Sequence, residues 1–196
     1  MRRTAMILGI HPITVARKLM YLSSKYKSKV FSKQDLYDAV KTIQFDELHT
    51  IEHTKCKPVA VAMAVSKETR KILGFSVSKM PASGHLAAIS RRKYGIRKNE
   101  RLKGLNTLFD HLKEHVKGPV HFQSDECRLY DQVVQSRFPG SSYEQFKGKK
   151  GCISGQGELK KVRIDPLFTI NHTFAMLRAN INRLIRRTWN TTKKLS

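Results

Sequence analysis

The sequence predicts an α/β fold in which helices flank a mixed sheet that follows a small N-terminal helical segment. Apolar residues recur at helical spacing within residues 2–29. From residue 40, short runs rich in β-forming residues follow one another, and from residue 100 helical and strand patterns alternate. The chain of 196 residues, 40% of them hydrophobic, is long enough for one full core or for one domain with a small appendage.

The N-terminal segment predicts two short helices around a turn at "GIHP". Gly9 is suited to end the first helix, and Pro12 is a start signal for the second. A short helix, a glycine-containing turn and a basic second helix resemble a helix-turn-helix. We therefore expect residues 1–30 to bind DNA, with Arg17 and Lys18 as phosphate contacts. An ordinary helical hairpin is the alternative.

The second predicted domain, residues 31–196, is organised around a sheet. The predicted elements are strands at 40–45, 57–66 and 71–79, a helix at 100–118, a strand at 119–124, a helix at 126–138, an edge strand at 141–146 and a long helix at 167–195. The polar connection at 67–70 has hairpin length, so its flanking strands are expected to pair antiparallel. Residues 81–99 are interpreted as a basic connection without an element of its own. Three antiparallel strands that lead into parallel additions form the order of the ribonuclease H-like fold.

Two aspartates are the candidate catalytic residues. Asp46 is predicted to end the first strand, and Asp125 to follow the fourth. If these strands are neighbours, the two carboxylates converge at one edge of the sheet, where hard oxygen ligands favour Mg²⁺ or Mn²⁺. Such ions support phosphoryl transfer by activating the attacking oxygen and stabilising the leaving one. The alternative is that each aspartate only begins a turn after a strand.

The charge balance predicts a polyanionic partner. Lys and Arg number 38 against 15 acidic residues, a formal net charge of +23, and nucleic acid is the commonest partner of so basic a chain. The 3 cysteines form no close pair, which fits a reducing compartment such as the cytoplasm. No run reaches the apolar length that spans a bilayer, and the N-terminus lacks a signal-peptide pattern, so no membrane partner is expected.

Three segments resemble a known family: "FDELHT", "FQSDECRLY" and "INHTFAMLRANINRLIRRTWNTTKK". They are similar to the catalytic blocks of the transposases of the insertion sequence one group, within the DDE transposase superfamily. The resemblance covers residues 40–196. It implies a ribonuclease H-like catalytic domain, Mg²⁺ or Mn²⁺ as cofactor, double-stranded DNA as partner, at least a homodimer on that DNA, and a nucleoid-associated location in a bacterial cytoplasm.

The resemblance also implies roles for individual residues. Asp46 and Glu47 match the family's Asp–Glu pair on the first strand. Asp125 matches its second aspartate, and Tyr130 matches the aromatic residue five positions later.

The third ligand position departs from the family pattern. The family carries an acid on the last helix and a basic residue seven positions later, and the matching positions here are Asn171 and Arg178. A neutral amide oxygen ligates Mg²⁺ without adding charge, so we expect the site to hold metal more weakly. Glu158 and Asp165 are alternative ligands, although Asp165 precedes Pro166 and is expected to mark the turn before the helix.

Other polar side chains have open roles. His172 is a candidate for contact with the scissile phosphate or for proton transfer, and a helix histidine bonded to backbone is the alternative. The pairs His49/His53 and His111/His115 have the spacing that clamps zinc on a helix, but the sequence indicates no third ligand for either. The basic residues of the last helix are expected to contact DNA phosphates, and they are Arg183, Arg186, Arg187, Lys193 and Lys194.

Three functions follow as hypotheses: an active transposase, a catalytically inactive DNA-binding remnant of one, and a nuclease or resolvase of the same fold. Truncation is a further expectation, because the helical pattern begins at residue 2 and the chain stops on a basic helix at Ser196.

Overall fold

Five strands form one mixed sheet in the order β3-β2-β1-β4-β5. The computed structural model describes residues 2–31, 37–38, 40–147, 165–181 and 184. The strands are β1 (Thr42–Ile51), β2 (Pro58–Ser66), β3 (Ile72–Lys79), β4 (His121–Asp125) and β5 (Ser142–Phe146). β2 pairs antiparallel with both β1 and β3, whereas β4 pairs parallel with both β1 and β5. The predicted α/β class and the step from antiparallel to parallel pairing are confirmed.

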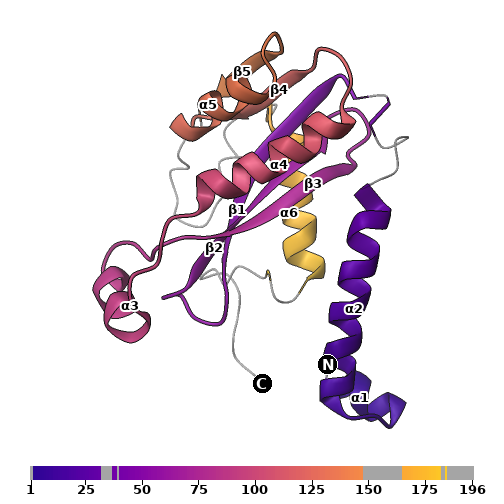
Figure 1. Ribbon diagram of the computed structural model, residues 1–196, viewed down its shortest axis with the longest axis vertical. Coiled ribbons are helices and arrows are strands. Elements are labelled where there is room, and N and C mark those ends of the chain that lie inside the picture. The colour runs from indigo at the N-terminus through magenta and orange to yellow at the C-terminus, as the bar shows by residue number, and fades with distance from the viewer. Residues whose placement is uncertain (1, 32–36, 39, 148–164, 182–183, 185–196) are drawn as a thin grey trace.

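Helices cover both faces of this sheet (Figure 1). On one face α4 (Arg101–His115) and α5 (Arg128–Arg137) pack over a core that includes Phe45, Phe109 and Phe122. On the opposite face α6 (Phe168–Asn180) packs through Ile170 and Phe174 against apolar side chains of β1 and β2. The helix predicted at 167–195 is shorter over the described residues, because α6 ends at Asn180 and Ile181, which is 42% exposed, is its C-cap. Residues 185–196 lie outside the described residues.

The first strand is longer than the sequence predicted. β1 continues to Ile51, so Asp46 lies in the middle of the strand and does not end it. Asp46 and Glu47 pair with Met63 and Ala62 of β2 in an unbroken antiparallel register. Backbone pairing with β2 continues from Ile43 to Ile51. This pairing outweighs the low strand propensity of the two acidic residues, so β1 runs through both of them.

A helix forms where the sequence indicated only a basic connection. α3 (Leu86–Tyr94) has no side-chain cap at its N-terminus, and its last turn is basic. Tertiary contacts hold it: the Ser90 hydroxyl donates to the carbonyl oxygen of Cys56 at 2.7 Å, and the Lys57 ammonium lies 4.4 Å from the centre of the Tyr94 ring. These partners are distant in sequence, so local patterns do not indicate them.

The N-terminal segment forms the two predicted helices, α1 (Arg2–Leu8) and α2 (Pro12–Phe31). Gly9, with φ 61°, adopts the left-handed conformation that ends α1. α2 spans 20 residues, longer than predicted, and extends away from the sheet (Figure 1). None of the helices in the part of the chain that the structure describes is long and apolar enough to cross a membrane.

Close contact between α4 and β3 sets the position of the helix over the sheet. A Cβ on Gly104 would lie 2.9 Å from the Cβ of Ser78, so only glycine allows α4 to approach the strand at this point. The approach buries Leu105, Leu108 and Leu112 of α4 almost completely.

Leu108→Ala and Leu102→Ala form a matched pair of substitutions on α4. Leu108 is 1% exposed and Leu102 is 37% exposed. We expect Leu108→Ala to reduce the free energy of unfolding by about 2–5 kcal/mol, because it leaves a cavity in the core. Leu102→Ala should cost less than about 1 kcal/mol. Urea denaturation of the three proteins measures both values, and equal losses would contradict this packing.

Candidate active site

The parallel pairing of β1 with β4 places two carboxylates at equivalent positions. Gln44 of β1 is paired with Gln123 of β4, an offset of 123 − 44 = 79 positions. The same offset relates Asp46 to Asp125, since 125 − 46 = 79. The backbone ladder between the strands ends at the glutamine pair. The two aspartates therefore lie two positions beyond the last paired residues, on the face of the sheet that α6 covers.

The side chains on this face meet across the two strands. Gln44 Nε2 donates to Gln123 Oε1 at 3.0 Å, and both glutamines are buried. Side chains two positions further along a strand point to the same face. Asp46 and Asp125 therefore occupy the next position of the same cross-strand row.

Electrostatics also indicate that the two carboxylates are close. Burial raises the pKa of Asp46 to about 7, and the negative charge of Asp125 is the second cause of this rise. Like charges raise the pKa of one member of a pair when both carboxylates share a site. A cation bound between them would remove this repulsion.

Glu47 lies on the opposite face of β1, where it has a cationic partner. Arg101, at the start of α4, donates from Nε to Glu47 Oε2 at 2.9 Å and forms a second bond from Nη2. The hydrogen bond to Glu47 raises the pKa of Arg101 above its already high value. Glu47 is thus ion-paired beside the acid pair, and its Oε1 has no hydrogen-bond partner among the described residues.

Tyr130 of α5 connects the two adjacent acids. Its hydroxyl lies 3.2 Å from Asp46 Oδ1 and 3.4 Å from Glu47 Oε2, in position to donate to either carboxylate. Burial and the neighbouring carboxylates, Asp46 first among them, raise the pKa of Tyr130 well above its ordinary value. Tyr130 therefore stays protonated and acts as a hydrogen-bond donor that orients Asp46.

The start of α6 is fixed to β1 by hydrogen bonds. Gln44 Nε2 donates to the carbonyl oxygen of Pro166 at 2.7 Å, and the backbone N–H of Ile170 donates to Gln44 Oε1 at 3.2 Å. Asp165 Oδ1 accepts the backbone N–H of Leu167 at 3.0 Å. The prediction that Asp165 marks the turn before the helix is confirmed, and this contact makes it a less suitable metal ligand.

Asn171 lies in the first turn of α6 and is partly buried. Its Nδ2 donates to Asp165 Oδ2 at 2.9 Å. Since a carboxylate only accepts, this bond identifies the amide nitrogen and leaves Oδ1 as the atom with lone pairs for a cation. Asn171 as third ligand stays a prediction. The other candidate, Glu158, lies outside the described residues.

His172 and Arg178, the remaining predicted site residues on α6, have different surroundings. His172 is exposed, stacks on Phe168 with ring centres 5.3 Å apart, and lines a pocket with Arg70 and Ile72. His49 of β1 has a lowered pKa because of burial, and both Arg101 and Arg178 contribute to the lowering. Arg178 therefore acts on the same end of β1 as the acids do.

The predicted DNA contacts are described only in part. Arg17 and Lys18 are exposed on α2, in agreement with a surface role. The basic residues predicted on the last helix, Arg183, Arg186, Arg187, Lys193 and Lys194, lie outside the described residues.

The donor set fits a hard divalent cation. Asp46 and Asp125 would supply carboxylate oxygens, and Asn171, if it joined them, would supply an amide oxygen, which are ligands that Mg²⁺ and Mn²⁺ accept. No third histidine, cysteine or acidic side chain among the described residues completes a compact group with the two aspartates. Asn171 therefore remains the expected third ligand.

Sequence reasoning missed Arg101 and His49 as neighbours of this site. Arg101 is one of many basic residues, and no spacing links it to Glu47, 54 positions away. His49 was noted only for its spacing from His53, although it follows Asp46 by three positions on the same strand.

Comparison with known proteins adds no relative. No protein-family model matches the sequence, and no curated protein matches it significantly. The function must therefore be inferred from the residues of this chain.

The raised pKa of Asp46 predicts a pH dependence of stability. The folded-state pKa of about 7 lies above the ordinary value of 3.8, so the folded protein holds the proton more tightly than the unfolded chain. This contribution to stability is fully present below the unfolded pKa and is lost as the pH rises through the folded pKa. The loss is on the order of 1.4 kcal/mol per pH unit between the two pKa values.

Asp46→Asn removes the titrating group and should abolish this part of the pH dependence. Denaturant unfolding at mildly acidic and mildly alkaline pH measures it for the wild type and the variant. Asp131→Asn, which alters an exposed carboxylate of α5, should keep the wild-type profile. The same pH dependence in the wild type and in Asp46→Asn would contradict the assignment.

Proposed function

We propose that the protein is a DNA transposase of the DDE type with a ribonuclease H-like catalytic domain. The observation that carries the proposal is the placement of Asp46 and Asp125 at equivalent positions of parallel neighbouring strands. The order of the five strands is compatible with this fold. The resemblance of the segments around Asp46, Asp125 and Asn171 to the insertion sequence one group supports the same class.

The proposed reaction has two phosphoryl transfers. In the first, the oxygen of water bonds to phosphorus at the end of the element, the P–O3′ bond breaks, and the released 3′ oxygen takes a proton. In the second, that 3′-hydroxyl attacks a phosphorus of target DNA in line, and a target 3′ oxygen leaves. A bound Mg²⁺ or Mn²⁺ would supply Lewis-acid polarisation of the phosphate and activation of the attacking oxygen.

The residues of the chain have distinct roles in this proposal. Asp46, Asp125 and the Asn171 amide oxygen would hold the cation. Tyr130 donates a hydrogen bond that orients Asp46, and Arg101 fixes the adjacent Glu47 through an ion pair. The net charge of +23 supplies affinity for the DNA backbone, with α1 and α2 as the proposed sequence-reading segment. Two element ends must be joined in one complex, so we propose at least a dimer on DNA.

A catalytically inactive DNA-binding remnant is the second candidate. The observation that favours it is the bond between Asn171 and Asp165, because the third position is neutral and already engaged with an acid. A nuclease of the same fold is a third candidate, which would hydrolyse DNA without joining ends.

Plasmid nicking with Mg²⁺ or Mn²⁺ tests the catalytic site. The wild type should nick supercoiled plasmid, and Asp46→Asn and Asp125→Asn should each lower the rate by about 100-fold or more, since each removes a charged ligand. Asp131→Asn should leave the rate unchanged. Asn171→Glu should lower the metal concentration needed for half-maximal nicking, because it adds a charge to the ligand set.

The outcomes distinguish the three candidates. Nicking by Asn171→Glu alone would indicate an intact fold with a disabled site. Joining of a labelled 3′ end to target DNA would separate a transposase from a nuclease. DNA binding without nicking by any protein, Asn171→Glu included, would overturn the catalytic proposal in favour of the remnant.

DNA binding by α2 has a quantitative signature. If Arg17 and Lys18 each contact one phosphate, the double variant Arg17→Ala/Lys18→Ala should weaken binding and reduce the slope of log K against log salt by about 2. Fluorescence anisotropy over a range of salt concentrations measures the slope. An unchanged slope would exclude Arg17 and Lys18 as phosphate contacts. Lys117→Ala, at an exposed position beyond α4, serves as the control.

A further inference from the structure

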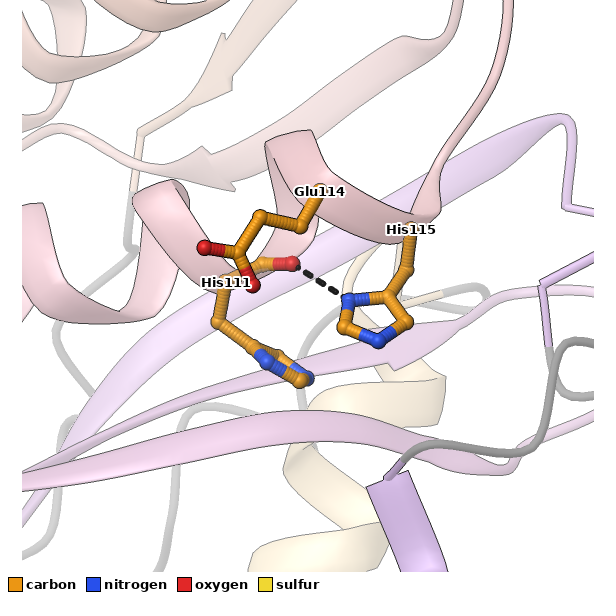
Figure 2. Close-up of side chains that lie close together, drawn as sticks. All are labelled: His111, Glu114 and His115. Atoms are coloured by element: carbon orange, nitrogen blue, oxygen red, sulfur yellow. Dashed lines mark hydrogen bonds between the residues drawn. The ribbon is translucent and has the colours of Figure 1, made fainter. Parts of the chain in front are cut away.

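The last turn of α4 brings together three side chains that ligate metals. His111, Glu114 and His115 each offer one ligand atom, and these atoms all lie within 4.8 Å of one another (Figure 2). It is the sole group of three or more such residues that the described part of the chain brings together. Glu114 supplies the third ligand that the sequence did not indicate for the pair His111/His115.

The cluster is separate from the acid pair. α4 packs on the face of the sheet that carries Phe45, whereas Asp46 and Asp125 face α6. The cluster also has a different chemistry, because two of its three donors are imidazole nitrogens. Imidazole suits zinc, copper, nickel and iron, whereas oxygen donors suit Mg²⁺ and Mn²⁺.

The hydrogen bond of His115 fixes which of its nitrogens carries the proton. His115 Nδ1 lies 2.9 Å from the backbone carbonyl oxygen of His111. A carbonyl only accepts, so Nδ1 is the protonated nitrogen that donates, and Nε2 carries the lone pair.

The hydrogen bonds of His111 fix its tautomer by the same reasoning. The Tyr37 hydroxyl donates its single proton to the carbonyl oxygen of Leu73 at 2.9 Å. Tyr37 Oη also lies 3.0 Å from His111 Nε2, and here it must accept. Nε2 of His111 is therefore protonated, and Nδ1 carries the lone pair.

Both histidines thus have the arrangement that metal-ligating histidines show. Each donates its N–H to an oxygen of the protein, which fixes the ring and directs the lone pair of the other nitrogen to the metal. Gly74 of β3 contributes to the fixing of His111, because a Cβ at this position would lie 3.0 Å from His111 Cδ2. Only the absence of that atom lets the ring pack against the strand.

We propose that His111, Glu114 and His115 form a site for a divalent transition-metal ion of the zinc class. Two nitrogens and one carboxylate oxygen provide three protein ligands, and water completes a tetrahedral site. Ligand atoms of such a site lie about 3.4 Å apart, which is compatible with three ligand atoms that all lie within 4.8 Å of one another. Glu114 is exposed and free to change rotamer, whereas His111 is fixed by its packing.

The proposed ion would join three parts of the chain. α4 supplies the ligands, while Tyr37, in the stretch between α2 and β1, and Leu73 of β3 form the hydrogen-bonded support. Zinc binding is therefore expected to raise the melting temperature of the protein. The competing interpretation is a metal-free cluster of packed rings. The ring centres of His111 and His115 lie 4.5 Å apart, and those of Tyr37 and His115 lie 4.9 Å apart.

Calorimetric titration of the full chain with Zn²⁺ tests the proposal. The protein carries no histidine tag, is freed of metal with a chelator, and is kept in millimolar Mg²⁺ so that oxygen-donor sites are occupied. We expect one zinc ion per chain at neutral pH and weaker binding at acidic pH, because protons compete with the metal for its ligands. Glu114→Gln and His115→Gln should each weaken binding about tenfold or more.

Two further variants sharpen the test. His53→Gln alters an exposed histidine outside the cluster and should bind zinc as the wild type does. Tyr37→Phe removes the acceptor for His111 Nε2 together with the donor to the carbonyl oxygen of Leu73, so it should weaken zinc binding about tenfold while the stoichiometry stays at one ion per chain. Either of two results would overturn the proposal in favour of the aromatic cluster. One is zinc binding that is unchanged in both Glu114→Gln and His115→Gln. The other is that the wild type binds no zinc at about 100 µM, a concentration that detects even weak sites.

Discussion

The arrangement of the sheet and of α6 depends on one buried side chain, that of Gln44. Its amide group donates to Gln123 Oε1 and to the carbonyl oxygen of Pro166, and it accepts from the backbone of Ile170. One residue thus ties β4 and the start of α6 to β1. A buried amide that lost these partners would cost about 1–3 kcal/mol, so few other registers of these elements are available. Because side chains alternate along a strand, fixing the glutamine pair also fixes the aspartates two positions further on.

Two adjacent acids of β1 have opposite electrostatic environments. Glu47 faces α4 and is neutralised by Arg101, whereas the largest charge effect on Asp46 is repulsion from Asp125. In a chain with a net charge of +23, an arrangement that leaves two carboxylates facing one another is costly unless something else compensates it. Clustered acids that repel one another therefore favour a site for an external cation over a purely structural role.

Periodicity predicted the order of the strands and most helices, because each has an apolar face that local patterns record. The prediction was wrong where tertiary contacts decide. Asp46 lies within β1 because pairing with β2 continues past it, and α3 forms because Ser90 and Tyr94 find partners around residue 56. The sequence also did not indicate the ion pair of Glu47 with Arg101, because 54 positions separate the two residues. Sequence reasoning thus predicted the two aspartates of the candidate site, but not the residues that orient them.

α4 connects the neighbourhood of the acid pair with the proposed zinc cluster. Its first residue, Arg101, holds Glu47, and its last turn carries His111 and His115. The helix spans 15 residues, about 22 Å, so an ion at one end exerts little direct electrostatic effect at the other across a screened medium. Any influence would have to pass through the position of the helix itself. α4 packs on β3 through Gly104 and buries Leu105, Leu108 and Leu112. Because this packing is close, the helix has a single position on the sheet. Coupling between sites requires an element with two arrangements. An ion at the histidine cluster would therefore stabilise the fold without regulating the acid pair.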